Sequence, residues 1–252
     1  MRLLGVVIMF QISYLASHSM EKEISNYQLI LSKLKSRASL KQEIYRNTVD
    51  VFAVAKKALS KLASRLHQDY TTNDPSVEVA YKDTHQFEAE LKFSGDMLLL
   101  SMHSNVFNFE EGHRIYSSSY IKANSSLSYC GVIYIHNFLA DSIKYNRLAD
   151  EGTLVARILI NKEKRFIVEG EGQLGFLYEA FSEHEINEEV LTHIFELAIL
   201  DCIDTDLQLP PYASVKDINL HQKQTTLAAS GYPTGKRLGY LFKSEVQQNN
   251  NL

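Results

Sequence analysis

The spacing of apolar residues changes twice along the chain, and this change constrains the fold more than any other feature. Between residues 76 and 169 apolar and polar residues alternate, most cleanly in QFEAELKF at 86–93. Alternation of this kind predicts half-buried strands with one solvated face. Further runs, RIYSSSYI at 114–121, LSYCGVIYIHNF at 127–138 and TLVARILI at 153–160, also indicate strands, and short turns such as those at 94–96 and 161–164 join neighbouring runs. Because parallel strands need long crossover connections, which are not visible here, the pattern predicts an antiparallel sheet.

Helical spacing flanks this region on both sides. Apolar residues recur three and four positions apart from Met20 to about His67, and again between Leu174 and Cys202. This spacing predicts helices before and after the strands. The sequence TTNDPS at 71–76 has the composition of a turn and ends the first helical region. We therefore predict an α+β fold, in which an N-terminal helical arm precedes an antiparallel β-sheet and C-terminal helices pack on one face of the sheet.

These patterns divide the chain into four segments. Residues 20–70 form the helical arm, residues 76–213 the α+β domain, and residues 214–252 a mixed tail whose end is expected to be disordered. Residues 1–19 have the outline of a signal peptide, but polar residues interrupt their apolar stretch. Two alternatives stay open for this segment: an exported leader, or a natural start at Met20. We predict a cytoplasmic protein, with export as the alternative.

The two cysteines, Cys130 and Cys202, each lie within an apolar run. This placement predicts buried thiols in a reducing compartment. A disulfide between them is the alternative, but two cysteines in a chain of this size do not make a disulfide scaffold.

Three glycines, Gly170, Gly172 and Gly175, have the spacing G-x-G-x-x-G between a predicted strand and a predicted helix. A dinucleotide-binding fold would need a second parallel strand after that helix, and the sequence places another helix there instead. Glu169 and Glu171 would also bring carboxylates to the place of a pyrophosphate, where like charges repel. We therefore predict a tight strand-to-helix corner and neither a dinucleotide nor another cofactor.

Two further patterns fall short of a phosphate or metal site. The sequence GYPTGKR at 231–237 has one residue too few between its glycines, and Arg237 replaces the required Ser or Thr of a phosphate-binding loop. Glu185, Glu189 and His193 recur at four-residue spacing on one helical face, but no distant third or fourth ligand can be identified. Acids at a helix N-terminus also interact favourably with its dipole, so we predict no metal site.

The segment 134–152 places many polar residues next to an apolar run. Candidates to line a ligand pocket there are His136, Asn137, Asp141, Lys144 and Arg147. His136 with Asp141 could form a general acid–base pair, although strand-edge and turn residues explain the same composition. Cys130 and His136 share a strand face but lie about 20 Å apart along it, so they cannot react with each other directly. No catalytic residue is predicted.

Charge is distributed unevenly along the chain. Between residues 33 and 65 nine basic residues stand against two acidic ones, a net charge of +7, whereas the whole chain carries −4 and the remainder therefore −11. The basic residues are Lys33, Lys35, Arg37, Lys41, Arg46, Lys56, Lys57, Lys61 and Arg65. Such an arm can dock on its own acidic body, form a solvated helix face, or bind an anionic partner.

We therefore expect a non-catalytic binding or interaction domain, in the form of a small-ligand sensor or an adaptor with a protein partner or self-association. The second hypothesis is a nucleic-acid-associated accessory protein that acts through the basic arm. The third is an enzyme with a site near His136 and Asp141. A membrane partner is not expected.

Overall fold

The computed structural model describes residues 25–70, 73–170, 172–221 and 223–224. The interpretations of residues 1–19, of the glycine-containing sequence at 231–237 and of the end of the tail fall outside these residues. The chain divides into two compact units, and the boundary between them in the sequence lies between Lys41 and Gln42.

In the first unit, helix α2 (Asn26–Lys33) leads into a π-helical turn, η1 (Leu34–Ala38). Ser25 caps α2, since its hydroxyl oxygen accepts a hydrogen bond of 3.2 Å from the backbone N–H of Gln28. Helix α3 (Ser39–Tyr70) begins at the end of η1 and continues into the second unit.

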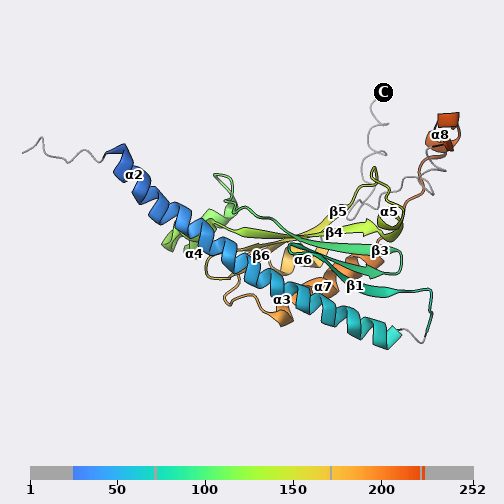
Figure 1. Ribbon diagram of the computed structural model, residues 1–252, viewed down its shortest axis with the longest axis horizontal. Coiled ribbons are helices and arrows are strands. Elements are labelled where there is room, and N and C mark those ends of the chain that lie inside the picture. Colours follow the sequence, from blue (N-terminus) through green and yellow to red (C-terminus); the bar gives the residue numbers. More distant parts are fainter. Residues whose placement is uncertain (1–24, 71–72, 171, 222, 225–252) are drawn as a thin grey trace, which may run out of the picture. The chain divides into compact units, whose positions relative to one another are not determined.

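The second unit is built on a six-stranded sheet in which neighbours in the sequence are also neighbours in space, all of them antiparallel (Figure 1). This confirms the predicted antiparallel sheet. The strands are β1 (Val79–His85), β2 (Glu88–Phe93), β3 (Asp96–Met102), β4 (Gly131–Leu139), β5 (Thr153–Ile160) and β6 (Phe166–Gly170).

Short helices occupy the connection between β3 and β4, and further helices follow the sheet. The first group comprises η2 (Arg114–Ser117), α4 (Ser119–Ala123) and η3 (Ser125–Ser128). The strand predicted at 114–121 is wrong: this segment forms two short helices, whose first turns are capped by the side chains of His113 and Ser118. Helix α5 (Ala140–Lys144) follows β4, and the later helices are α6 (Gly172–Leu177), α7 (Glu188–Ile203) and α8 (Tyr212–Val215). The α+β fold with helices before and after the sheet is thus confirmed.

Helices α3 and α7 pack against the same face of the sheet, which we call the inner face. The main hydrophobic core lies there and joins buried side chains of α3, such as Phe52 and Leu59, to Phe195 of α7 and to Leu91 and Ile133 of the strands. Burial of these apolar side chains is the main favourable contribution to folding. The sequence pattern predicts that residues 20–70 form an arm separate from the α+β domain. From Ile44 onward, however, the buried side chains of α3 belong to the core of that domain.

The three glycines of the G-x-G-x-x-G sequence form the corner between β6 and α6. Gly172 has a φ of +56°, in the left-handed region that glycine adopts at little cost. A Cβ atom at Gly175 would lie 2.2 Å from the carbonyl oxygen of Gly170. Helix α6 is followed by α7 and not by a parallel strand, so the corner lacks the second half of a dinucleotide-binding unit.

The opposite, outer face of the sheet is partly covered by the connection between β3 and β4. A second hydrophobic cluster forms there, in which Ile115, Ile121 and Leu127 of the connection pack with Val132 and Ile167 of the strands. The rest of the outer face is more polar, as the alternation in the sequence predicted.

Candidate functional site

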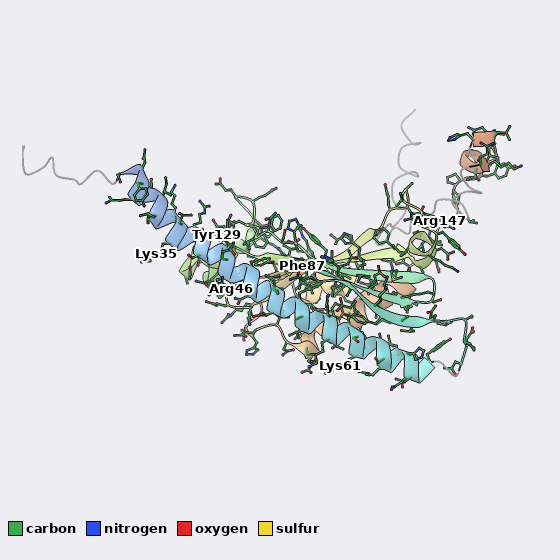
Figure 2. The ribbon with its side chains drawn as sticks, in the orientation of Figure 1. Lys35, Arg46, Lys61, Phe87, Tyr129 and Arg147 are labelled. Carbon is green, nitrogen blue, oxygen red and sulfur yellow. The ribbon has the colours of Figure 1, made fainter. Side chains whose placement is uncertain are left out.

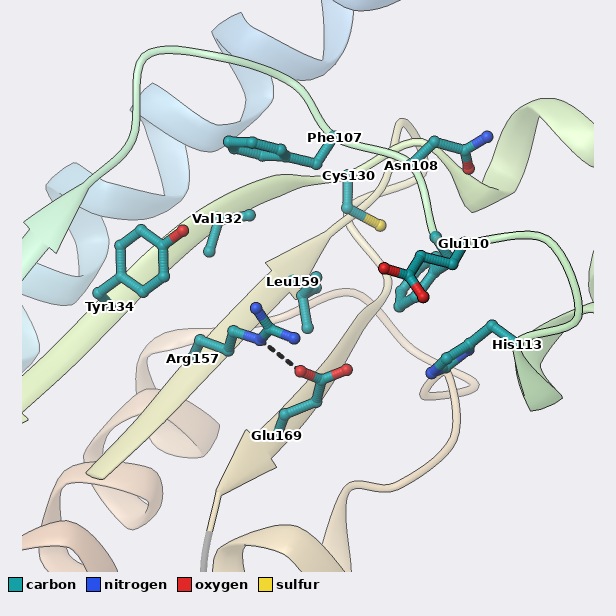
Figure 3. Close-up of a pocket in the computed structure, with 11 residues that line it drawn as sticks. Phe107, Asn108, Glu110, His113, Cys130, Val132, Tyr134, Arg157, Leu159 and Glu169 are labelled. Carbon is teal, nitrogen blue, oxygen red and sulfur yellow. Dashed lines mark hydrogen bonds and ion pairs between the residues drawn. The ribbon is translucent and has the colours of Figure 1, made fainter. Parts of the chain in front are cut away.

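A pocket of about 430 Å³ lies on the outer face, between the segment 107–113 and strands β4, β5 and β6 (Figure 3). This volume is within the range of small-molecule sites. Eleven residues line the pocket: Phe107, Asn108, Phe109, Glu110, His113, Cys130, Val132, Tyr134, Arg157, Leu159 and Glu169.

Aromatic rings hold the pocket rim against the sheet. Phe107 pairs with Cys130 of the chain before β4 through two backbone hydrogen bonds of 2.8 and 2.9 Å. The ring of His103 contacts Phe107 at 4.8 Å and Tyr134 at 6.4 Å between centroids. Farther along the rim, Phe109 stacks on His113 at 4.7 Å. The rim is therefore positioned before any ligand arrives.

The charged groups of the pocket do not cancel. Arg157 and Glu169 are partners in the register of β5 and β6, and their side chains form an ion pair (Figure 3). Glu110 also faces this space (Figure 3), and no basic side chain pairs with it among the residues that the structure describes. With His113 counted as neutral, the lining carries one net negative charge, which Glu110 contributes.

A second pocket of about 400 Å³ shares His113 and Glu169 with the first. Its side chains are largely paired with one another. Arg114 forms an ion pair of 2.8 Å with Glu179, and the guanidinium of Arg165 lies 4.7 Å from the ring centroid of Tyr120. Burial and a hydrogen bond to Glu163 raise the pKa of Tyr120 to about 12. Glu183 also lines this second pocket and forms no ion pair with a described residue, so with His113 counted as neutral its lining too carries one net negative charge. The second pocket differs from the first in its rings, since Tyr120 and Phe181 pack against each other at 5.6 Å.

The five ligand-pocket candidates from the sequence lie in different places. Asp141, Lys144 and Arg147 line a separate pocket of about 490 Å³ next to the turn between β2 and β3. His136 and Asn137 are not among the described residues that line it. His136 lies on the outer face, with its ring 5.8 Å from that of Tyr134.

Asn137 is directed to the inner face and is buried, and its Nδ2 donates a hydrogen bond of 3.1 Å to Asp96. In the part of the chain that the structure describes, no hydrogen bond or ion pair joins His136 to Asp141. The geometry therefore gives no support to an acid–base pair of these two side chains.

The pKa of His136 gives a test of its position. Burial lowers this pKa below its ordinary value of 6.5. As the pH falls through 6.5, the unfolded chain binds a proton at His136 that the folded state binds less readily. The contribution of His136 to the free energy of unfolding is therefore fully present above about pH 6.5 and is lost progressively below it. We expect His136→Gln to flatten the pH dependence of the urea unfolding midpoint between roughly pH 7 and 5. His184→Gln, at an exposed site, is the control. If the urea midpoint of His136→Gln depends on pH as steeply as that of the natural sequence, burial does not lower the pKa of His136.

Part of the basic helix contacts acidic groups of its own domain. Lys56 pairs with Asp83 of β1, and Lys57 and Lys61 both pair with Glu188 at the start of α7. These contacts support the self-docking alternative for the second half of the helix. Arg46 and Arg65 are exposed on the same helix. Figure 2 shows Arg46 and Lys61 along α3. The remaining four basic residues, Lys33, Lys35, Arg37 and Lys41, belong to the first unit.

Neither a metal site nor a disulfide is present in the described ranges. No three His, Cys, Asp or Glu side chains there are placed to hold a metal ion. Cys130 and Cys202 form no disulfide and are buried, and they belong to the clusters on opposite faces of the sheet. Burial, followed by the charge of Glu169, raises the pKa of Cys130, so its thiol is poorly suited to act as a nucleophile.

Comparison of the chain with protein-family models, with curated proteins and with solved structures returned no match. Of the helices that the structure describes, none combines the length and the apolar composition needed to cross a bilayer.

Proposed function

We propose that this protein is a non-catalytic ligand-binding domain, that the outer-face pocket is its site, and that its ligand is a small organic cation. The observation that carries the proposal is the carboxylate of Glu110, which faces a space walled by aromatic rings and has no basic partner among the described residues.

The chemistry of the lining favours a cation over an anion or a neutral molecule. Phe107, Phe109 and Tyr134 line the pocket, and the face of an aromatic ring carries a negative quadrupole that attracts an ammonium group. Glu110 supplies a full counter-charge, while Arg157 is neutralised by Glu169. The apolar floor formed by Val132 and Leu159 suits the hydrocarbon part of such a ligand. An anion would meet two carboxylates and only one paired guanidinium.

The cellular compartment is part of the proposal. Two buried cysteines that form no disulfide are compatible with a reducing environment, and we infer a cytoplasmic location. The hypothesis of a nucleic-acid accessory protein is weaker for the second half of the basic helix, since three of its lysines pair with acidic groups of the domain.

The charge requirement can be tested with two compounds of nearly the same shape. Choline carries a quaternary ammonium, and 3,3-dimethylbutan-1-ol replaces its nitrogen with carbon. We expect choline to shift NMR signals of Tyr134 and of residues 107–113, and the alcohol to bind about tenfold more weakly or not at all, as exposed cation–π and ion-pair contributions imply.

Glu110→Gln removes the counter-charge with almost no change in shape, and we expect it to weaken choline binding by about twofold to fivefold. Glu111→Gln is the matched control, because Glu111 is the next residue, is also exposed and does not line the pocket. Equal binding of the two compounds, or equal effects of the two substitutions, would refute the proposal.

A further inference from the structure

The first unit of the chain exposes a cluster of large apolar side chains. They lie on α2 and the first residue of η1, within eight consecutive positions, and no residue of α2 is buried. Their exposed fractions are 69% for Tyr27, 44% for Leu29, 55% for Ile30, 48% for Leu31 and 55% for Leu34. Contiguous apolar surface of this kind is unfavourable in water and marks an interaction surface.

The same stretch is strongly basic. Residues 26–41, which we call the basic apolar segment, contain Lys33, Lys35, Arg37 and Lys41 and no Asp or Glu. In the part of the chain that the structure describes, no acidic side chain pairs with Lys33, Lys35 or Lys41. The lysines in the second half of α3 differ, since they pair with acids of the domain.

Helical spacing brings these two properties together. Tyr27, Ile30, Leu31 and Leu34 follow the spacing i, i+3, i+4, i+7, which aligns them along one side of a helix. The basic residues begin at Lys33, between Leu31 and Leu34, and continue over the next two turns. Tyrosine, with an apolar ring and a polar hydroxyl, suits a boundary between an apolar phase and water.

We propose that the basic apolar segment binds the surface of an anionic lipid bilayer. A bilayer with acidic headgroups offers both an apolar phase for the exposed side chains and negative charge for the lysines. A nucleic acid offers the charge but no apolar phase for leucine and isoleucine. A second copy of the segment would cover the apolar side but would bring two groups of four positive charges together.

The sequence alone did not predict a membrane partner, because it does not show which part of the basic region is paired. The structure divides that region into lysines with partners in the domain and lysines without an acidic partner among the described residues. Lys33, Lys35 and Lys41, which have no acidic partner among the described residues, lie in the same segment as the exposed apolar side chains.

Co-sedimentation of the full chain with vesicles tests the proposal. We expect binding to vesicles of phosphatidylcholine with phosphatidylserine, little binding to phosphatidylcholine alone, and a decrease in binding with added salt. Neutralising Lys33, Lys35 and Lys41 together by substitution to Gln should weaken binding on the order of 100-fold, since each basic residue near an anionic surface contributes about fivefold.

A matched control changes the net charge of the chain equally. Lys122→Gln, Lys216→Gln and Lys223→Gln lie at exposed sites of the second unit, and together they should leave binding within about twofold. The double variant Ile30→Ser and Leu34→Ser keeps the charge and removes apolar area, and it should also lose most of its binding.

Three outcomes would overturn the proposal: equal binding to both kinds of vesicle, equal loss in the segment and control variants, or no binding to either vesicle. If the segment variants abolish binding to RNA or DNA, or change a dimer to a monomer, without affecting vesicles, the partner is a nucleic acid or a second copy. None of these outcomes depends on the outer-face pocket, so choline binding is tested separately.

Discussion

Phe195→Ala is expected to lower the free energy of unfolding by about 3–5 kcal/mol, the usual cost of removing a phenyl ring from a packed core. Among the described residues, Phe195 is the largest fully buried side chain, with an exposed fraction of 0%. It lies on α7 within the cluster that also contains residues of α3 and of the sheet. Removal of its ring therefore leaves a cavity where the two helices and the strands meet.

Urea unfolding followed by circular dichroism measures this effect. Phe176→Ala is the matched control: it makes the same chemical change on α6, where 77% of the side chain is exposed. We expect the control to change the free energy of unfolding by no more than about 0.5 kcal/mol. If the two variants lose equal stability, α7 does not pack in the core as described.

The sheet is the part of the fold that the sequence predicts best. Turns too short for a crossover predict antiparallel pairing of β1 with β2, β2 with β3 and β5 with β6, as observed. The connection from β3 to β4 is long enough for a crossover, so the antiparallel pairing of these two strands needed the structure. The helical arm is less predictable. Its spacing indicates a helix, but an apolar stripe does not show whether it covers its own sheet or another molecule. The structure shows both situations in one continuous helical region: from Ile44 the stripe is in the core, and between Tyr27 and Leu34 it is exposed.

The outer-face pocket was missed, although part of its signal is present in the sequence. The sequence predicts the turn at 161–164, but counting outward from it places Val168 opposite Arg157. The observed register of β5 and β6 differs by one residue and pairs Arg157 with Glu169. Both charged residues interrupt otherwise apolar strands. The positions of Glu110 and His113 could not be predicted in this way. Both residues lie in the irregular connection between β3 and β4, where no repeating pattern of apolar residues indicates how the chain crosses the sheet.

The charge asymmetry also needed the structure for its interpretation. A count of nine basic and two acidic residues is the same whether the lysines face water or acids. Only the contacts to Asp83 and Glu188 show which lysines the domain itself neutralises. Pairs of this kind, separated by more than twenty residues in the sequence, depend on how the helix docks on the sheet.

Gly175→Ala is expected to lower the free energy of unfolding by about 1–3 kcal/mol, the typical cost of forcing an extra carbon into a packed site. The new Cβ would lie 2.2 Å from the carbonyl oxygen of Gly170, which is backbone and cannot rotate away, so the corner between β6 and α6 must shift. Gly95→Ala is the matched control, because a Cβ there has no atom within 4 Å and the residue is not at positive φ.

Thermal unfolding of both variants, with and without NAD or ATP, separates the two interpretations of the glycine sequence. If these glycines form only a corner, Gly175→Ala lowers the melting temperature, Gly95→Ala does not, and neither nucleotide raises that of the natural sequence. A nucleotide site predicts the opposite: a ligand that binds only the folded state raises the melting temperature with its concentration, and Gly175→Ala would abolish that rise. We expect the first result, because β6 contains no basic residue and Arg157 of the neighbouring β5 is already paired with Glu169, so neither strand offers an unpaired cation to a pyrophosphate.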